Sequence, residues 1–349
     1  MAEKEVLNCL DAATGKPLWT SSYPASYKDR FGFDEGPRAV PTIDNGRVYT
    51  NGAAGVLSCT DLKNGKKIWR LDTHVSFKPR ESFFGTACAP LVSGGKVFVQ
   101  VGGTTGIGSG GKSSGIVAFD SETGKPLWGS TSDEAGYSSP VIGELAGKTR
   151  LVCFTRTGIV ILDPGTGNIL YEKRWRARIG ASVNAATPVL TNDMVYFSSS
   201  YQTGSICLKA SGSGYRELWS GDRILSSHYS SSIQNSGYLY GFDGRQEYGT
   251  QLRCVSLAGG KIAWSEAQPG EKRFGCGTLI LAGDKLLVMA DSGDLILARV
   301  SPKGYSRLGS AAILNDTVRA YPALAGGFFY ARSTGELVCV DLRKKTRAK

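Results

Sequence analysis

The segment GIVAFDSETGKPLW, residues 115–128, decides the fold of this chain. Strand-forming residues lead to Asp120, whose carboxylate can accept backbone N–H bonds in the turn that follows. Gly124 supplies the positive φ that such a turn needs, at little steric cost. A second strand then carries the large aromatic Trp128, which can pack against a neighbouring sheet. The segment therefore predicts a β-hairpin with an aromatic anchor.

The same hairpin recurs through the chain, roughly once every 45 residues. Clear copies are VLNCLDAATGKPLW (6–19), GVLSCTDLKNGKKIW (55–69) and GIVILDPGTGNILY (158–171). Weaker copies are GSICLKASGSGYRELW (204–219), QLRCVSLAGGKIAW (251–264), GDLILARVSPKGYSRL (293–308) and GELVCVDLRK (335–344). The repeated positions that we expect to be structural are Asp11, Gly15, Trp19, Asp61, Gly65, Trp69, Asp120, Gly124, Trp128, Asp163, Gly167, Trp219 and Trp264.

Two further strands precede each hairpin, as in APLVSGGKVFVQV (89–101) and TPVLTNDMVYFSS (187–199). The unit is thus four strands, A to D in chain order, and its period of roughly 45 residues fits one blade of a β-propeller. No stretch sustains a 3.6-residue apolar period, so we expect almost no helix. Residues 1–342 are predicted to form one all-β propeller domain, and residues 343–349 a basic tail.

The blade number depends on the chain ends, where both terminal copies are incomplete. Eight C-type strands favour an eight-bladed propeller with incomplete first and last blades. In the alternative, the two partial sets merge into one blade and the propeller has seven. The eight-bladed interpretation also suggests a truncated or fragmentary gene product that lacks upstream strands.

Composition excludes several classes of protein. The formal charge is +11, but the last seven residues, RKKTRAK, hold five of these charges, which indicates a solvated tail rather than a nucleic-acid surface. No apolar run reaches the ~18–20 residues of a membrane helix, and the opening MAEKEV has no signal-peptide core. Two histidines leave little room for metal sites or imidazole chemistry, and no metal site is expected.

The repeated pattern Ala/Cys-x-Asp-x-x-Thr-Gly-Lys-x-x-Trp resembles the tryptophan-docking repeat of PQQ-like (quinoprotein-like) β-propellers. The segments GPRAVPTIDNGRVYTNGAAGVLSCTDLKNGKKIW (36–69) and RAYPALAGGFFYARSTGELVCVDL (319–342) carry the likeness furthest. The superfamily includes quinoprotein alcohol dehydrogenases and BamB-like proteins. The resemblance implies a periplasmic or otherwise exported location for the full-length protein, although this chain shows no signal peptide.

The dehydrogenases of that superfamily bind PQQ with adjacent cysteines, a Trp beneath the quinone, and Asp, Asn and Glu around Ca²⁺. This chain has no Cys-Cys pair, and its six Trp lie in or beside the repeat turns. We therefore expect no cofactor and no catalytic residue, and a non-catalytic module that binds a partner or acts as a scaffold through its loop face. A PQQ- and Ca²⁺-dependent dehydrogenase remains the alternative, and a hydrolase would need a carboxylate pair such as Asp34 and Glu81.

The segment GIGSGGKS, residues 106–113, matches the phosphate-binding pattern G-x-x-x-x-G-K-[ST] through Gly106, Gly111, Lys112 and Ser113. That pattern works when a helix follows and aims its N–H groups at phosphate. Here a repeat strand follows instead. We expect the segment to be the loop between strands B and C, and not a nucleotide site.

The eight cysteines are expected to be free thiols. Five of them, at Cys9, Cys59, Cys207, Cys254 and Cys339, occupy one equivalent position of strand C, where a small apolar residue suits a packed sheet. Equivalent positions of neighbouring blades lie too far apart for disulfides, and no C-x-x-C spacing is present.

The loops that join strand D to the next strand A are rich in Arg and aromatic residues and contain both histidines. Arginine suits a carboxylate or phosphate group because its planar fork forms two parallel hydrogen bonds. The partner is expected to be a protein or an anionic small molecule, with no nucleic acid and no membrane span. The candidate ligand-binding residues are Asp34, Arg38, His74, Arg178, Asn184, His228, Arg273 and Arg319. In the alternative interpretation, these residues are ordinary charged residues at the rim of the propeller that pair with local carboxylates.

Overall fold

The computed structural model describes residues 3–29, 31–32, 36–80, 82–107, 113–212, 214–266 and 275–343. The chain divides into two compact units, and each is described by itself. The first unit comprises Met1–Phe197 and Lys209–Arg216, and the second comprises Ser198–Leu208 and Glu217–Lys349. The single domain predicted for residues 1–342 stays a prediction.

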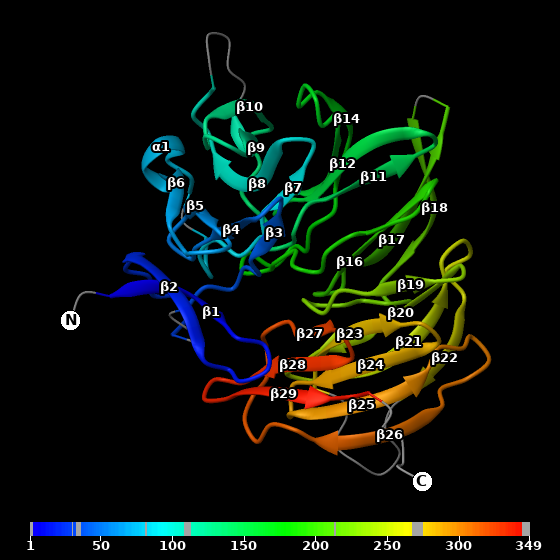
Figure 1. The fold of residues 1–349 in the computed structure, drawn as a ribbon. Helices are drawn as coiled ribbons and strands as arrows, with labels where there is room; N and C mark the ends of the chain where they lie inside the picture. The colour runs from blue at the N-terminus through cyan, green and yellow to red at the C-terminus, as the bar shows by residue number, and fades with distance from the viewer. Residues whose placement is uncertain are drawn as a thin grey trace. The chain divides into compact units, whose positions relative to one another are not determined.

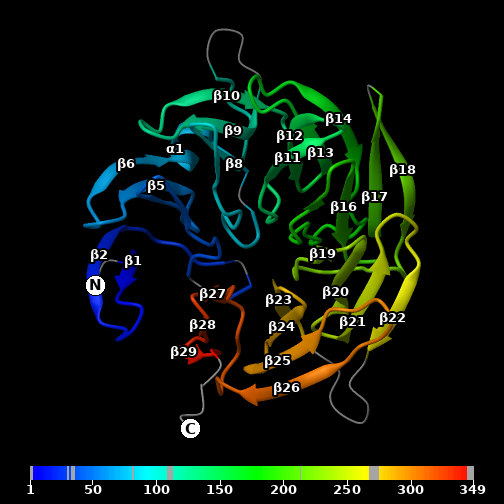
Figure 2. The same ribbon diagram turned by 45° about the vertical axis from the view of Figure 1, so that its right-hand side comes forward.

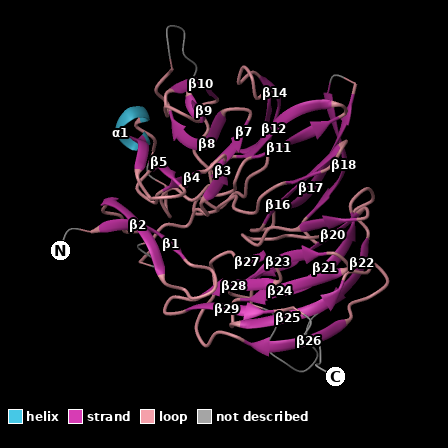
Figure 3. Ribbon diagram, in the orientation of Figure 1, coloured by secondary structure: helices cyan, strands magenta, loops and turns pink. Residues whose placement is uncertain are grey.

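Nearly all regular structure in the described residues is antiparallel β-sheet (Figure 1, Figure 3). The strands before residue 189 are β1(Lys4–Leu10), β2(Pro17–Pro24), β3(Thr42–Asp44), β4(Arg47–Asn51), β5(Val56–Asp61), β6(Lys67–Asp72), β7(Leu91–Ser93), β8(Lys96–Gly103), β9(Ser114–Asp120), β10(Pro126–Ser130), β11(Val141–Leu145), β12(Lys148–Phe154), β13(Gly158–Leu162) and β14(Ile169–Arg174). The later strands are β15(Val189–Leu190), β16(Met194–Ser199), β17(Gly204–Ser211), β18(Gly214–Gly221), β19(Ile233–Asn235), β20(Tyr238–Arg245), β21(Gly249–Ser256), β22(Ile262–Glu266), β23(Gly277–Ala282), β24(Lys285–Ala290), β25(Asp294–Arg299), β26(Arg307–Ala312), β27(Ala323–Ala325), β28(Phe328–Arg332) and β29(Leu337–Asp341).

Consecutive strands form blades, as the sequence predicts. Four neighbouring strands pair in chain order in six sheets, β3–β6, β7–β10, β11–β14, β15–β18, β19–β22 and β23–β26. Figure 2 shows the strands of β19–β22 side by side. The residues of the sheet β15–β18 are divided between the two units. The all-β propeller class with four-stranded blades is therefore confirmed.

The eight-bladed prediction is wrong, and the blade number is the seven of the alternative, although the two partial sets form separate sheets in the described residues. Beyond the six complete sheets, the described residues contain the three-stranded sheet β27–β29, which is the seventh blade, and the hairpin β1–β2. The prediction counted C-type strands, and the first of these, β1, pairs only with β2. A hairpin of two strands is not a blade, so eight C-type strands do not make eight blades.

The repeat turn has the hydrogen bonds that its sequence predicts. The Asp120 Oδ1 atom accepts bonds from the backbone N–H of Thr123 at 2.8 Å and of Glu122 at 3.1 Å. The hydrogen bond from the Thr123 hydroxyl, and then these backbone bonds, lower the pKa of Asp120. Gly124 has φ +70°, and a Cβ there would lie 2.6 Å from the Trp69 ring. Trp69 of the preceding blade thus packs on this turn, and its indole N–H donates to the Ser121 carbonyl at 3.0 Å.

Blade-to-blade packing forms the core of each unit. Leu57 and Cys59 of β5 are fully buried and pack against Val97, Val117 and Phe119 of the next sheet in the first unit. The pattern repeats in the second unit, where Leu252 and Cys254 of β21 pack against β24 and β25. None of the eight cysteines forms a disulfide, as predicted.

The described residues hold one helix, α1(Thr73–Phe77), which is a single turn capped by the Asp72 carboxylate. No helix in this part of the chain is long and apolar enough to cross a membrane. Strand β9 begins at Ser114, directly after the GIGSGGKS segment, and pairs with β8. The described residues of the segment, Gly106, Ile107 and Ser113, lie between β8 and β9, as predicted, whereas residues 108–112, including Gly111 and Lys112, lie outside the described residues.

Candidate functional site

Arg38 lies in a loop of the first unit and is already bound within the protein. Its Nη2 donates to the Asp29 carboxylate at 2.9 Å, and Asp29 has a fully buried side chain. Its Nη1 donates to the Phe84 carbonyl at 3.1 Å, and the guanidinium lies 5.9 Å from the Tyr27 ring and 5.7 Å from the Phe84 ring. Arg38 therefore ties two loops together. The sequence pointed to Arg38 but missed its partner Asp29.

Four aromatic rings gather beside Arg38 in the same unit. The Phe31 ring lies 5.8 Å from Phe83 and 5.4 Å from Phe84, and Phe84 lies 5.7 Å from Tyr137. The backbone N–H of Phe84 donates to the Tyr137 hydroxyl at 3.1 Å. Phe31 is 50% exposed, so the cluster presents an aromatic surface to solvent.

Two arginines pair with one carboxylate next to these rings, and a third arginine shares a carbonyl with one of them. Arg156 lies 3.0 Å from the Glu134 carboxylate, and Arg80 lies 3.3 Å from it. Both Arg156, at 2.7 Å, and Arg176, at 3.3 Å, donate to the Gly180 carbonyl. Burial, and then the positive charge of Arg156, lowers the pKa of Arg176. The group carries an excess of positive charge, which suits an anionic ligand or partner.

Arg156 joins the two groups, because its guanidinium lies 4.6 Å from the centre of the Phe83 ring. We call the combined surface the Arg–Phe surface. It consists of Phe31, Arg80, Phe83, Phe84, Glu134, Tyr137 and Arg176, together with the buried Arg156 that joins them. Sequence reasoning missed Arg156 because it searched the D-to-A loops, whereas Arg156 lies in the turn between β12 and β13.

Buried polar contacts hold these loops in place. The Gln100 amide accepts from the Gly136 N–H at 2.8 Å and donates to the carbonyls of Ser138 at 2.7 Å and Phe154 at 3.2 Å. Gly136 is required here, since a Cβ would lie 2.4 Å from the Phe154 carbonyl oxygen. A glutamine within the apolar strand FVQV was the signal in the sequence that could have revealed this brace.

Two other predicted ligand residues of the first unit also serve as braces. Asn184 is 2% exposed and donates to the carbonyls of Thr155 at 2.9 Å and Trp175 at 3.0 Å. The half-buried His74 lies 3.3 Å from the Thr86 hydroxyl. Arg178 is exposed.

The remaining candidates belong to the second unit or lie outside the described residues. Asp34 and Arg273 lie outside them, as does Glu81 of the carboxylate pair considered above. His228 and Arg319 belong to the second unit. Convergence of the eight predicted residues on one ligand therefore stays a prediction.

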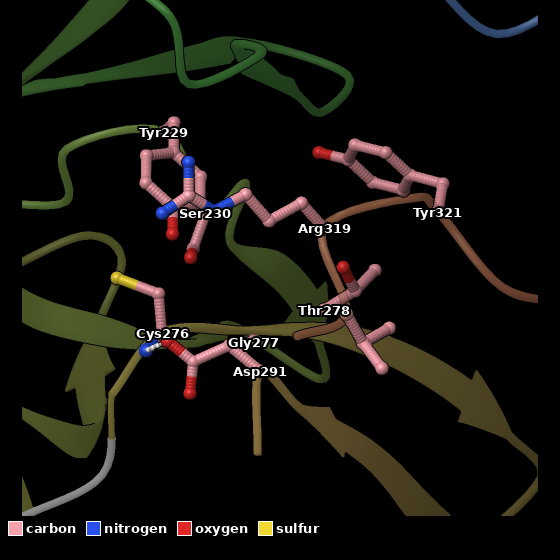
Figure 4. Close-up of a pocket in the computed structure, with 9 residues that line it drawn as sticks. Tyr229, Ser230, Cys276, Gly277, Thr278, Asp291, Arg319 and Tyr321 are labelled. Carbon is pink, nitrogen blue, oxygen red and sulfur yellow. Dashed lines mark hydrogen bonds between the residues drawn. The ribbon is translucent and has the colours of Figure 1, made fainter. Parts of the chain in front are cut away.

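Arg319 is exposed and lines a small cavity with Tyr229, Ser230, Cys276 and Asp291 (Figure 4). The guanidinium lies beside Tyr229 and Ser230 in this view. The Cys276 N–H donates to the Asp291 carboxylate at 2.8 Å. The cavity has a volume of about 20 Å³, which holds about one water molecule and is too small for a phosphate or carboxylate ligand.

His228 is 8% exposed and lies 2.8 Å from the Tyr201 hydroxyl and 2.9 Å from the Gln246 amide oxygen. Burial lowers the pKa of His228 from its ordinary value of 6.5. The unfolded chain therefore binds this proton more tightly than the folded one, so stability is fully present above pH 6.5 and falls as the pH drops towards the folded pKa.

We expect a His228→Gln variant to lose this part of the pH dependence, because glutamine does not titrate. Urea midpoints of both proteins between about pH 5 and 8 measure the difference. Parallel pH profiles for the two proteins would contradict the assignment.

Comparison with known proteins places these features in context. A family model described as outer membrane protein assembly factor BamB matches residues 3–266. A search of curated proteins found no match. The solved structure of BamB from Moraxella catarrhalis is similar, with a TM-score of 0.66 and 17% identity, over 99% of this chain and 91% of that chain. At this identity the likeness shows the fold alone.

Two other solved structures are more distant. The computationally designed Ika8 protein has a TM-score of 0.48 and 11% identity, over 87% of this chain and 97% of that chain. The quinohemoprotein alcohol dehydrogenase from Comamonas testosteroni has a TM-score of 0.46 and 14% identity, over 93% of this chain and 67% of that chain.

Proposed function

The chain belongs to the family of the outer membrane protein assembly factor BamB, and from this premise we propose that it is a non-catalytic module that binds a partner protein through the Arg–Phe surface. The family confirms the predicted PQQ-like, BamB-like resemblance. By the same membership we propose that the protein works in an exported location. Its partner is unidentified.

The observation that carries this proposal is the exposed ring of Phe31, within a cluster of aromatic rings, beside an excess of positive charge. Aromatic residues and arginine are the side chains that contribute most to protein interfaces. Phe31 supplies exposed apolar area, and Arg80, which is 76% exposed, supplies accessible charge. Such a surface suits an acidic partner segment that also carries apolar side chains.

The hydrogen bonds of the tryptophan side chains support the proposal that the protein acts without a quinone cofactor. The indole N–H groups of five tryptophans donate to carbonyls in the adjoining repeat turn, as in Trp128 to Pro164 and Trp264 to Ser301. The other three donors are Trp19, Trp69 and Trp219. These rings are used in blade packing, so we propose that the protein functions without PQQ and Ca²⁺.

A fluorescent peptide of alternating glutamate and phenylalanine is a suitable probe. We expect it to bind the full chain with an affinity that falls as salt rises, because the Debye length shrinks from about 10 Å at 0.1 M to about 3 Å at 1 M. Arg80→Glu and Phe31→Ser should each weaken binding about tenfold, which corresponds to about 1.4 kcal/mol.

The control is Leu127→Ser, which alters a side chain that is 47% exposed on β10 and outside the surface. Fluorescence anisotropy measures all four proteins. Equal affinities for the wild type, Arg80→Glu and Phe31→Ser would exclude this surface. Dye-linked alcohol oxidation after incubation with PQQ and Ca²⁺ would exclude the non-catalytic role.

A further inference from the structure

A small cavity of the second unit has an exposed aromatic ring in its wall. It is the cavity of about 20 Å³ beside Arg319, and Tyr321, which is 49% exposed, also lines it (Figure 4). The Tyr321 hydroxyl lies 2.9 Å from the Ser231 hydroxyl. Ser231 directly follows Tyr229 and Ser230, which line the cavity as well. One hydrogen bond therefore joins the Tyr321 side chain to the segment that forms part of the cavity wall.

Two hydroxyl groups of the wall, those of Tyr229 and Ser230, have no hydrogen-bond partner among the described residues. Ser230 is 4% exposed. Burial raises the pKa of Tyr229, so its hydroxyl keeps its proton and can donate. Their neighbour Cys276 offers only a thiol, which is a weak hydrogen-bonding group. Because buried hydroxyls are usually hydrogen-bonded, these two indicate that a polar group binds in the cavity.

Access to these hydroxyls depends on Arg319. Its exposed side chain lies beside Tyr229 and Ser230 (Figure 4). Exposed side chains change rotamer within nanoseconds, so Arg319 can move aside for a small group and then donate to it.

The cavity wall carries one positive and one negative side chain, Arg319 and Asp291. The Asp291 carboxylate accepts the Cys276 N–H at 2.8 Å, and the Asp291 backbone carbonyl accepts the N–H of Val318 at 3.0 Å. An anion in the cavity would be repelled by Asp291 and a cation by Arg319. A hydroxyl group is neutral, and it can accept from Arg319 and donate to Asp291. A volume of about one water molecule fits one hydroxyl group.

We propose that this cavity and the Tyr321 ring bind a neutral saccharide. One hydroxyl group of the sugar enters the cavity between Arg319 and Asp291, and the C–H face of the sugar ring packs on the exposed ring of Tyr321. The face of an aromatic ring is the negative side of its quadrupole, and it attracts such C–H groups. Val318, the aliphatic residue of the wall, is 5% exposed, so the accessible wall offers an aromatic ring and polar groups rather than an aliphatic pocket.

The site lies entirely in the second unit. The inference therefore goes beyond the function proposed for the Arg–Phe surface and does not depend on it.

The test titrates the full chain with three neutral trisaccharides, maltotriose, cellotriose and tri-N-acetylchitotriose, and NMR measures the affinity. We expect at least one of them to bind. Its affinity should be the same at about 0.1 M and about 1 M salt, because a neutral ligand is not screened by ions. The acidic probe of the Arg–Phe surface, by contrast, should bind less tightly at high salt.

Three variants test the residues of the site. Tyr321→Ala removes the ring and should weaken sugar binding about tenfold or more, whereas Tyr321→Phe should retain most of it. Ser230→Val fills the cavity and should also weaken binding about tenfold. The matched control is Tyr248→Ala, at a tyrosine of the same unit that is 72% exposed and does not line the cavity. It should leave the affinity unchanged, and circular dichroism checks that each variant is folded.

Failure of all three sugars to bind the wild type would overturn the proposal, as would equal affinities for the wild type, Tyr321→Ala and Ser230→Val. A thermal midpoint that rises with chloride at constant ionic strength, in the wild type but not in Ser230→Val, would also overturn it if no sugar binds, and would identify an anion site. Tyr321→Ala should leave binding of the acidic probe unchanged, and Arg80→Glu should leave sugar binding unchanged, so the two proposals fail separately.

Discussion

Replacement of Gln100 by leucine is expected to lower the free energy of unfolding by about 3 kcal/mol, because a buried group left without its hydrogen bond costs about 1–3 kcal/mol. Gln100 is 1% exposed, and its amide serves three backbone groups, the Gly136 N–H and the carbonyls of Ser138 and Phe154. Leucine has a similar volume, so the loss is one of hydrogen bonds rather than of packing. Urea denaturation measures the change.

The same substitution is expected to weaken binding at the Arg–Phe surface. The loop that Gln100 holds carries Glu134 and Tyr137, and Glu134 is the carboxylate that positions Arg80 and Arg156. Gln234→Leu, at a half-buried glutamine of β19, is the control and should change stability little. An unfolding midpoint for Gln100→Leu equal to that of the control would show that the amide is not a brace.

Replacement of Trp69 by alanine is expected to cost about 3–5 kcal/mol, the range for truncating a large buried aromatic side chain. Trp69 is 8% exposed, lies 6.1 Å from the Tyr49 ring and packs on Gly124 of the next blade. Its truncation leaves a cavity between two blades and removes the bond to the Ser121 carbonyl. Urea denaturation followed by circular dichroism measures the loss.

Two further variants separate the loss of packing from the loss of the hydrogen bond. Trp69→Phe keeps most of the ring and loses the indole N–H, so it should cost about 1 kcal/mol from the hydrogen bond plus a smaller packing loss. Leu127→Ala, at a half-exposed residue of β10, should cost far less than Trp69→Ala. Equal losses for Trp69→Ala and Leu127→Ala would show that the aromatic does not join the blades.

The hairpin was predictable because its determinants are local. Asp120, Gly124 and Trp128 lie within nine residues of one another, and each acts through turn geometry or a neighbouring strand. The blade number was not predictable in the same way, because counting strands of one type does not reveal whether their partners are present. Strand β1 has the sequence of strand C yet lies in a hairpin of two strands.

The candidate site was only partly predictable, for a different reason. Arg38 was identified from its loop, but Glu134 and Arg156 meet through tertiary structure, from separate blade elements. Polar loop residues such as Asn184 and His228 were predicted to contact a ligand. In the structure they form hydrogen bonds with buried groups of the protein itself. A sequence does not distinguish a polar residue that binds a ligand from one that forms hydrogen bonds with buried polar groups of the interior.

The small residue that strand C places beneath each aromatic has a chemical consequence. Burial raises the pKa of the Cys254 thiol, on strand C, to about 11, and the same cause raises the pKa of Cys88, which lies outside strand C, to about 11. Near neutral pH only about one such thiol in ten thousand is ionised. Disulfide exchange proceeds through the thiolate, so packing between blades also slows oxidation. Burial between the blades thus protects these cysteines from disulfide exchange.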